Sequence, residues 1–404
     1  MNTSLLFHAF GAQGLVVTKT EYKNSKVYVF AYTNSDKLRC PCCHSKDIIR
    51  RGTVQRELRG VPIGSKEVML HLTIQRLFCK RCYTLRQEHL PFAKERRRYT
   101  RAFERHVIDL CRIATLEDVS NHLNVSWDTV KDIQKRYLKS RYQYPDITGV
   151  RRIGIDEFAV RKGHKYMTVV ACLDTGRILW VGDGKGGDAL KGFWKRYKKH
   201  LPKIQAVSTD MSPAFVSAVS TNLPNASLVV DHFHVIKLFN TTLDEIRRDL
   251  FRMEKDLNKR SVIKGLRWLL LRNTESLTDE RDEKSRLQKA LDINKPLAEA
   301  YLLKEDLRQL WMQKDRATAE LYLVSWVKRA WATKTTKLVK FGNTILAFRN
   351  MILNYYDHPI STGKLEGINN KIKTMKRQAY GFRDMEFFKL KIYALHDKKY
   401  ALVG

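Results

Sequence analysis

The chain has 404 residues and a formal net charge of +33, with 75 Lys and Arg against 42 Asp and Glu. Hydrophobic residues make up 43%, so the chain can bury a sizeable core, and its length suits about two to four domains. The basic excess is spread along the sequence, which favours a polyanionic partner and makes nucleic acid the first candidate. No apolar run reaches the length of a membrane-spanning helix, and the first residues lack the basic start of a signal peptide. We therefore expect a cytoplasmic chain with no membrane partner.

Seven cysteines include two C-x-x-C pairs, and the four residues of these pairs are Cys40, Cys43, Cys79 and Cys82. In an intracellular chain such pairs indicate metal binding or free thiols rather than disulfides. Four thiolates in two pairs suit a tetrahedral Zn²⁺ ion, and the alternating pattern between the pairs predicts a zinc ribbon built on β-hairpins. Two alternatives stay open: unrelated pairs of free thiols, or a site in which Cys42 or His44 replaces a ligand.

The next segment predicts a helix-turn-helix. A second helix, from Trp127 to Leu138, is expected to follow an N-cap at Ser126. Its inward residues would be Val130, Ile133 and Tyr137, and its outward residues Lys131, Gln134 and Lys135. This helix is the candidate for the major groove of DNA, with Trp127, Lys131 and Lys135 as contacts. The alternative is an ordinary helical hairpin.

The middle of the chain predicts a mixed sheet. Three strands are expected within residues 153–181, followed by helix, strand, helix, strand and helix up to residue 236. Strand–helix–strand crossovers imply a parallel extension of the antiparallel meander, which is the ribonuclease H-like arrangement. Asp156 on the first strand and Asp210 at the end of the fourth would then converge. The alternative for Asp156 is a lone carboxylate bonded to backbone amides.

A third carboxylate comes from the last part of the chain. Residues 237–356 are helical in pattern and are expected to form an insertion. A further helix, capped by Ser361 or Thr362, carries Glu366 in its first turns and could bring it to Asp156 and Asp210. Three carboxylates close together repel one another, and Mg²⁺ or Mn²⁺ relieves that repulsion. Two such ions would activate water or a 3′-hydroxyl for attack on a phosphodiester.

Other polar residues surround these acids. His234 is expected to orient a scissile phosphate or to donate a proton, with a structural histidine as the alternative. Lys373, Lys376 and Arg377 are expected to hold the DNA backbone, unless they form only a solvated basic helix face. The remaining acids of this region are better explained as turn, cap or outward-facing residues: Glu157, Asp174, Asp183 and Asp188.

Four motifs carry a resemblance to a known family. They are GIDEFA at Asp156, STDMSPAF at Asp210, DHFHV at Asp231, and STGKLEGINNKIKTMKRQAYGF at Glu366. Together they resemble the DDE transposases of bacterial insertion sequences, and most closely the ISL3 family. The resemblance implies that Asp156, Asp210 and Glu366 form the catalytic triad. It also implies a homo-oligomer on paired DNA ends, in a bacterial cytoplasm at the nucleoid. The extra cysteine of CPCC, Cys42, departs from the family pattern.

We therefore predict a multidomain α+β protein. It comprises a zinc-ribbon DNA-binding domain (1–94), a helix-turn-helix domain (95–148), a ribonuclease H-like α/β catalytic core in two parts (149–236 and 357–404), and a large helical insertion (237–356). The predicted function is that of a transposase, which binds terminal inverted repeats and performs metal-dependent strand cleavage and strand transfer. Two rivals remain: a related nuclease that does not join strands, and a zinc-dependent DNA-binding repressor without catalysis.

Overall fold

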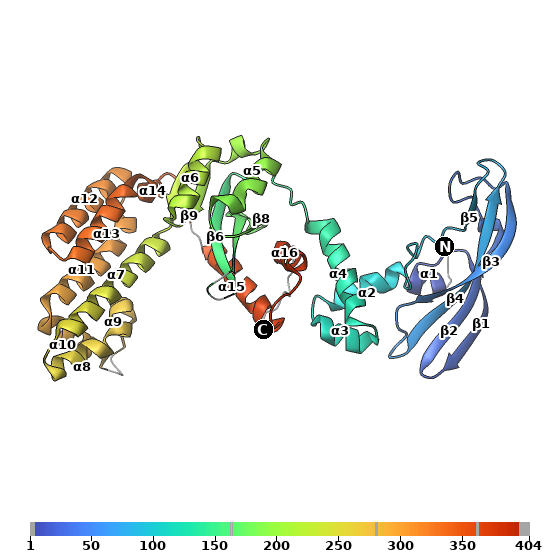
Figure 1. The fold of residues 1–404 in the computed structure, drawn as a ribbon, viewed down its shortest axis with the longest axis horizontal. Helices are drawn as coiled ribbons and strands as arrows, with labels where there is room; N and C mark the ends of the chain where they lie inside the picture. Colours follow the sequence, from blue (N-terminus) through green and yellow to red (C-terminus); the bar gives the residue numbers. More distant parts are fainter. Residues whose placement is uncertain (1–4, 162, 164, 279–281, 361–362, 396–404) are drawn as a thin grey trace. The chain divides into compact units, whose positions relative to one another are not determined.

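The computed structural model describes residues 5–161, 163, 165–278, 282–360 and 363–395. These residues form two compact units. The first unit holds the chain up to Gln143 together with Ala379–Leu390, and the second holds Tyr144–Gln378 together with the described residues from Lys391 onward. Figure 1 colours the chain along its sequence and labels the elements of each unit.

The first unit begins with a short helix and a five-stranded sheet. Its elements are α1 (Leu5–Phe10), β1 (Leu15–Lys23), β2 (Lys26–Thr33), β3 (Ile48–Arg59), β4 (Glu67–Cys79) and β5 (Leu85–Gln87). The strands follow the order β1-β2-β4-β3, with β5 beside β4. The antiparallel pairing of β3 with β4 confirms the expected hairpin. The parallel pairing of β2 with β4 and the helix α1 were not predicted.

Three helices follow, and they confirm the predicted helix-turn-helix. Their bounds are α2 (Arg101–Leu110), α3 (Leu116–Leu123) and α4 (Trp127–Tyr142). The turn forms because Asn124 adopts the left-handed conformation, at φ 49°, and Ser126 caps α4 by accepting the Thr129 amide. Val130 and Ile133 are buried as expected. The outward prediction for Gln134 is wrong, because positions i, i+3 and i+4 share a helix face and Gln134 is buried beside these two residues.

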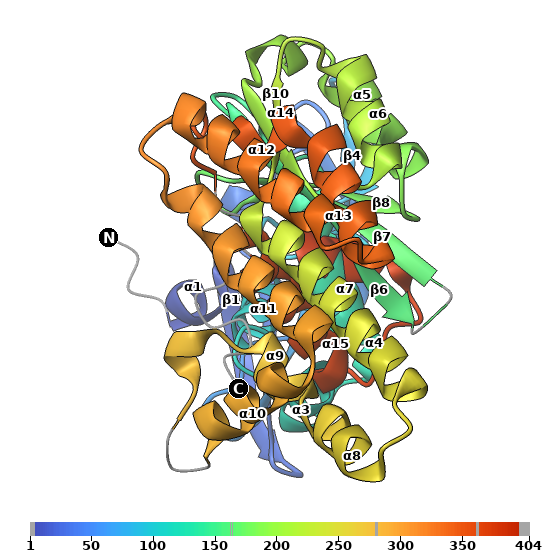
Figure 2. The same cartoon turned by 90° about the vertical axis from the view of Figure 1, so that its left-hand side faces the viewer.

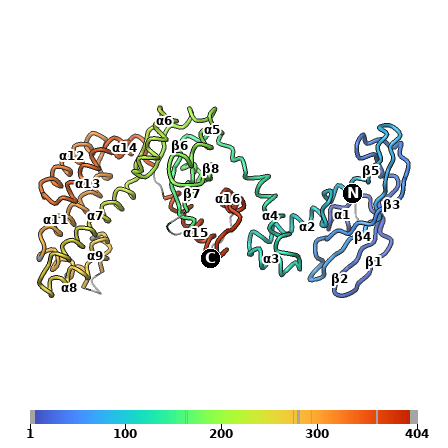
Figure 3. The backbone as a smooth tube through the Cα atoms, in the orientation of Figure 1, coloured from blue at the N-terminus to red at the C-terminus, as the bar shows by residue number. Residues whose placement is uncertain are grey.

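The second unit is built on another five-stranded sheet. Its strands are β6 (Arg152–Arg161), β7 (Lys165–Cys172), β8 (Ile178–Asp183), β9 (Ala206–Thr209) and β10 (Ser227–Val230). They lie in the order β10-β9-β6-β7-β8, with β6, β7 and β8 antiparallel and with β9 and β10 parallel to β6. This order confirms the predicted mixed sheet, and Figure 3 follows the chain through it. Helices α5 (Lys191–Tyr197) and α6 (Pro213–Asn222) bury their apolar side chains in the same core as strand residues such as Ile155 and Val207.

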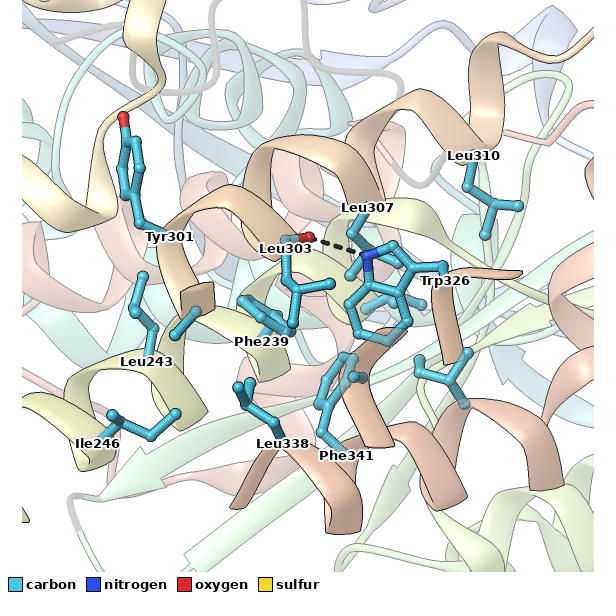
Figure 4. Close-up of a cluster of buried hydrophobic side chains, with 14 of the residues drawn as sticks. Phe239, Leu243, Ile246, Tyr301, Leu303, Leu307, Leu310, Trp326, Leu338 and Phe341 are labelled. Atoms are coloured by element: carbon cyan, nitrogen blue, oxygen red, sulfur yellow. Dashed lines mark hydrogen bonds between the residues drawn. The ribbon is translucent and has the colours of Figure 1, made fainter. Parts of the chain in front are cut away.

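A large helical region leaves the sheet after β10. Its helices are α7 (His232–Met253), α8 (Leu257–Gly265), α9 (Arg267–Leu271), α10 (Glu283–Ile293), α11 (Lys295–Arg308), α12 (Arg316–Ala332), α13 (Thr336–Ala347) and α14 (Arg349–Leu353). Figures 1 and 2 show α7, α11, α12 and α13 side by side. Phe239, Trp326 and Phe341 meet edge to face in their core, where the Trp326 indole donates to the Leu303 carbonyl at 2.9 Å (Figure 4). The region thus has a hydrophobic core, which Val230 at the end of β10 also joins.

Helix α15 (Gly363–Gln378) returns the chain to the sheet and packs against β6. The predicted caps Ser361 and Thr362 lie outside the described residues. Helix α16 (Met385–Tyr393) follows, and the Tyr393 hydroxyl accepts the Val181 amide of β8 at 3.0 Å. Among the helices of the described ranges, none combines the length and the apolar composition that a transmembrane segment needs.

Candidate functional site

The two C-x-x-C pairs form one cluster. Cys40 and Cys43 lie between β2 and β3, Cys79 ends β4, and Cys82 lies in the turn that follows. The Sγ atoms of Cys40 and Cys82 are 3.5 Å apart, as are those of Cys43 and Cys79. All four sulfur atoms lie within 4.8 Å of one another. Zn–S bonds of about 2.3 Å in a tetrahedron place sulfur atoms about 3.8 Å apart, so the cluster has the dimensions of a zinc site.

The thiols of the cluster differ in acidity. A hydrogen bond from the Ser45 backbone lowers the pKa of Cys43, but burial and the neighbouring thiols raise it to about 12. The backbone amide of Cys43 is the main reason why the pKa of Cys40 falls to about 6. A lowered pKa favours the thiolate, which is the form that binds metal. Cys42 is exposed and accepts a hydrogen bond from the Thr84 hydroxyl at 3.7 Å. Neither Cys42 nor His44 belongs to the cluster of four sulfur atoms.

Helix α4 carries the side chains predicted to contact DNA. The Trp127 ring is 42% exposed, and the Lys131 ammonium lies 5.3 Å from its centroid. Lys131 and Lys135 lie 3.2 and 2.9 Å from one oxygen of the Asp384 carboxylate. Two of the three predicted DNA contacts on this helix therefore have an acidic partner within the chain.

Asp156 and Asp210 lie on neighbouring strands of the second sheet. The parallel register pairs Ile153 with Val207 and Gly154 with Ser208. Asp156 lies two residues beyond Gly154 on β6, and Asp210 lies two residues beyond Ser208, just past the end of β9. Asp210 directly follows β9, where its carboxylate accepts the Ser212 amide at 3.1 Å. The predicted convergence of these two acids agrees with the strand order.

Asp156 is a largely buried carboxylate with several partners. Burial is the main cause that raises its pKa, and the negative charge of Asp210 raises it further. The amide of Glu157, at 2.8 Å from Oδ1, and the positive charges of His234 and Lys237 act in the opposite direction. The hydrogen bond from the Glu157 amide matches the alternative interpretation of Asp156, that of a carboxylate bonded to backbone amides. The other oxygen, Oδ2, accepts a 2.6 Å hydrogen bond from the side-chain amide of Asn369 on α15.

Glu366 lies on α15, one turn before Asn369, and its side chain is exposed. The helix can approach β6 closely because Gly154 has no side chain: a Cβ there would lie 2.5 Å from Leu365. Among the described residues, the four cysteines are the only group of three or more potential metal ligands within 4.8 Å of one another. Within the described residues, Asp156, Asp210 and Glu366 do not form such a group, so the expected approach of Glu366 to the other two acids is not seen.

The start of α7 contributes two histidines. Asp231 is buried, caps α7 through the Phe233 amide, and pairs with His232 at 2.9 Å. Burial would raise the pKa of Asp231, but the hydrogen bonds from His232 and Phe233 lower it. His234 lies close enough to Asp156 to lower the pKa of that carboxyl. Sequence reasoning did not identify His232 as the partner of Asp231, although their adjacency at a cap was visible.

Glu157 was expected to be a turn, cap or outward-facing residue, and it neither lies in a turn nor caps a helix. It lies within β6 and is only partly exposed. Burial and then the negative charge of Asp210 raise the pKa of Glu157, while Lys185 lowers it. The charge of Asp210 thus acts on both neighbouring acids of β6, Asp156 and Glu157. The pair of adjacent acids in GIDEFA was the available signal.

The three basic residues predicted on α15 have different environments. Lys373 and Arg377 are exposed. The Lys376 ammonium instead donates to the backbone carbonyls of Ala159 and Val160, both at 2.8 Å, and so holds the helix against β6. Lys373 and Arg377 can meet phosphates as they stand, whereas Lys376 would have to leave these carbonyls.

Comparison with known proteins shows the family to which the chain belongs. A family model described as "Transposase" matches residues 153–392, which is more than half of the chain. The chain belongs to the ISL3 family of transposases. The helix-turn-helix domain of that family matches residues 88–138, and a zinc finger described for the transposases of IS204, IS1001, IS1096 and IS1165 matches residues 36–82.

Full-length relatives agree with this assignment. The transposase for insertion sequence element IS1001 of Bordetella parapertussis is 31% identical over 95% of this chain and 96% of its own length. The transposase for IS1557 of Mycobacterium tuberculosis is 27% identical over 85% of this chain and 82% of its own length. In this ISL3 transposase, the cysteine cluster, the helices α2 and α3, helix α4 up to Leu138, and the candidate acids fall within the three matched segments.

Proposed function

We propose that this transposase cuts DNA at the ends of an insertion sequence and joins the 3′-hydroxyl ends to target DNA. Its catalytic residues would be Asp156, Asp210 and Glu366. The observation that carries the proposal is the placement of Asp156 and Asp210 on adjacent parallel strands, with the helix of Glu366 packed on the first of them. Three protein segments far apart in sequence would thus supply acids to one site.

The residues present fit a divalent cation. Asp156 is a buried acid whose pKa is raised by burial and by Asp210, so added positive charge would stabilise its ionised form. The Oδ1 atom of Asn369 beside it is buried and has no hydrogen-bond partner. Hard oxygen ligands of this kind suit Mg²⁺ or Mn²⁺. When bound, such ions would activate water or a 3′-hydroxyl and stabilise the leaving oxygen.

The other residues would bind and orient DNA. His234, within electrostatic range of Asp156, would orient the scissile phosphate or donate a proton to the leaving oxygen. Lys373 and Arg377 on the exposed side of α15 would hold the backbone, and Lys376 would join them if it left its carbonyls. Glu366 is exposed one turn from Asn369, so a rotation of its own side chain can carry it towards Asp156.

The fold of the catalytic part supports the same proposal. An antiparallel meander extended by two parallel strands, with helices in the crossovers, is the arrangement that the sequence led us to expect of a ribonuclease H-like core. Residues 237–356, which comprise most of α7 together with α8 to α14, would be the insertion before the catalytic Glu. The five-segment division at residues 94, 148, 236 and 356 remains our prediction of the domains.

The N-terminal elements would recognise the DNA ends. Cys40, Cys43, Cys79 and Cys82 would hold a structural Zn²⁺ ion, which fixes the tips of β3 and β4. The helix-turn-helix would bind terminal inverted repeats, with Trp127, Lys131 and Lys135 on its second helix. We further propose a homo-oligomer on paired ends, acting at the nucleoid in a bacterial cytoplasm.

The test is cleavage of a duplex that carries the element's own end, with Mg²⁺ or Mn²⁺, by the wild type and by Asp210→Asn. We expect metal-dependent nicking at the repeat boundary, and its loss in the variant with DNA binding retained. Asp188→Asn is the matched control, because Asp188 is an exposed acid paired with Lys191 at 2.7 Å, outside the site. Equal nicking by Asp210→Asn would refute the assignment of this acid.

The same assay separates the rival functions. Strand-joined products with target DNA identify a transposase, whereas nicked products alone identify a nuclease that does not join strands. Specific binding without nicking, unchanged in Asp156→Ala, would identify a DNA-binding repressor.

A further inference from the structure

One segment of the chain lies in the unit to which its neighbours in sequence do not belong. Ala379–Leu390 directly follows α15, the helix of Glu366, yet it packs within the first unit with the helix-turn-helix. Helix α4 is its contact, through two acidic side chains, Asp384 and Glu386. This placement gives the DNA-binding helix an acidic partner.

The contacts are a continuous series of ion pairs. Asp384 lies 3.2 Å from Lys131 and 2.9 Å from Lys135, and Glu386 lies 2.8 Å from both Lys135 and Lys139. The three lysines are spaced by four residues and therefore form a single stripe along α4. We call them the lysine stripe. Every member of the stripe is paired with at least one of the two acids, and Lys135 is paired with both.

The pairs are partly shielded from water. The side chains of Lys131 and Lys135 are only 21% and 25% exposed, against 50% for Lys139. Burial would raise the pKa of Asp384, but the Phe387 amide and the two lysines lower it to about 2. Asp384 is therefore ionised at neutral pH, and its carboxylate offers oxygen acceptors to lysines as a phosphate does.

We propose that Asp384 and Glu386 mimic DNA phosphates and mask the lysine stripe of α4 until DNA displaces them. This inference rests on the proposed function, in which α4 binds DNA. A duplex can compete because it offers many phosphates at once, whereas the segment offers only the two carboxylates of Asp384 and Glu386. Displacement would free a segment that is continuous with the helix of Glu366, so recognition of a DNA end would be reported directly to the catalytic helix.

The experiment uses the full-length protein with Asp384→Asn and Glu386→Gln combined. Asn at position 384 can still accept the Phe387 amide, which Asp384 now accepts at 3.0 Å at the start of α16. Affinity for a duplex carrying the element's end would be measured by fluorescence anisotropy at several salt concentrations. We expect roughly tenfold tighter binding. The slope of log K against log [salt] should steepen by about 0.9 for each additional phosphate contact.

The matched control is Glu245→Gln with Asp249→Asn. These two acids pair with Lys337 on α13, at 3.3 and 2.9 Å, so the control removes the same charge without touching α4. The masking proposal would be overturned if the test variant gained no more affinity for DNA than the control, or if it bound DNA more weakly than the wild type. Adding Lys131→Gln, Lys135→Gln and Lys139→Gln to the test variant should abolish the gain.

Two further outcomes are distinguishable. If neither wild type nor variant prefers the element's end over unrelated DNA, the proposed function fails rather than the mask alone. If the double variant does not fold, Glu386→Gln carries the test by itself, because its side chain is 51% exposed and its loss frees Lys139. We expect about threefold tighter binding from that single change, and no gain would overturn the proposal.

Discussion

At the scale of single residues, Asn369 connects the two halves of the candidate active site. It lies on the helix of Glu366 and donates to Asp156 at 2.6 Å. A hydrogen bond to a charged group contributes about 1.5–3 kcal/mol. We expect Asn369→Ala to slow cleavage roughly tenfold or more, because Asp156 loses its orientation, while specific DNA binding stays unchanged. Single-turnover cleavage of the element's end would measure this effect.

Asn370 offers the control for that change. It is the next residue of the same helix and is exposed. Asn370→Ala should leave the cleavage rate within about twofold of wild type. A similar loss in both variants would mean that helix stability, rather than the bond to Asp156, determines the rate.

Asp231 and His232 make stability depend on pH in two directions. The pKa of Asp231 is lowered from 3.8, so its contribution is present above that value and lost as pH falls through the folded pKa. The pKa of His232 is raised from 6.5 by Asp231, so its contribution is present below 6.5 and lost as pH rises through the folded pKa. We expect Asp231→Asn to lower Tm most between pH 4 and 6.5. The Tm of Asp231→Asn should then lie about 2 °C below that of the wild type, because His232 is half exposed and solvent screens its charge.

Thermal unfolding monitored by circular dichroism from pH 4 to 9 checks this prediction. Asp315→Asn is the control: Asp315 also caps a helix, through the Thr318 amide at 2.8 Å, and its lowered pKa has no histidine among its causes. Its effect on Tm should not shrink between pH 6 and 9. If the effect of Asp231→Asn on Tm is also constant between pH 6 and 9, the pairing with His232 does not contribute to stability.

At the scale of elements, Gly154 sets the distance between β6 and α15. A methyl group at this position would lie 2.5 Å from Leu365 and 2.7 Å from Leu173. We expect Gly154→Ala to destabilise the second unit by about 1–3 kcal/mol and to impair cleavage more than DNA binding, because α15 must move outward. Urea unfolding and the cleavage assay measure the two effects. Gly367→Ala on the same helix meets nothing within 4 Å and should be neutral or slightly stabilising.

The cysteine cluster brings together two segments, the loop before β3 and the end of β4 with the turn that follows it. We expect Cys79→Ser to lose bound zinc and specific DNA binding together, because the remaining three thiols leave the tetrahedron incomplete. Cys42→Ser should retain one zinc per chain, since Cys42 is exposed and outside the cluster. Metal content by mass spectrometry checks both. Loss of zinc in Cys42→Ser would move that cysteine into the ligand set.

At the scale of the whole molecule, the charge of +33 dominates encounters with DNA. Affinity for DNA of unrelated sequence should fall steeply with salt, by about 10³-fold or more between 50 and 200 mM if six or more phosphates are neutralised. Anisotropy titrations with a random duplex would show this slope. A flat salt dependence would mean that most of the positive charge does not face DNA.

Much of the architecture follows from local pattern. The alternation of strands and helices after Asp156 predicted the mixed sheet, and the two C-x-x-C pairs predicted the cluster. Features made by distant segments were beyond such reasoning: the parallel pairing of β2 with β4, and the acids Asp384 and Glu386 against α4. Gln134 was misplaced because a polar residue was assumed to face solvent, although its helical position lies on the buried face.

The return of Ala379–Leu390 to the first unit has a consequence for incomplete copies of the protein. A ribosome that stops within the helical region would release a chain with all the zinc-ribbon and helix-turn-helix residues, but without Glu366 and without the two acids that pair with α4. On the proposed roles of Glu366 and of the two acids, such a fragment would not cut DNA, and its lysine stripe would have no acidic partner from this segment. Shortened products of the same gene would thus compete with the intact protein for the element's ends and hold down its copy number.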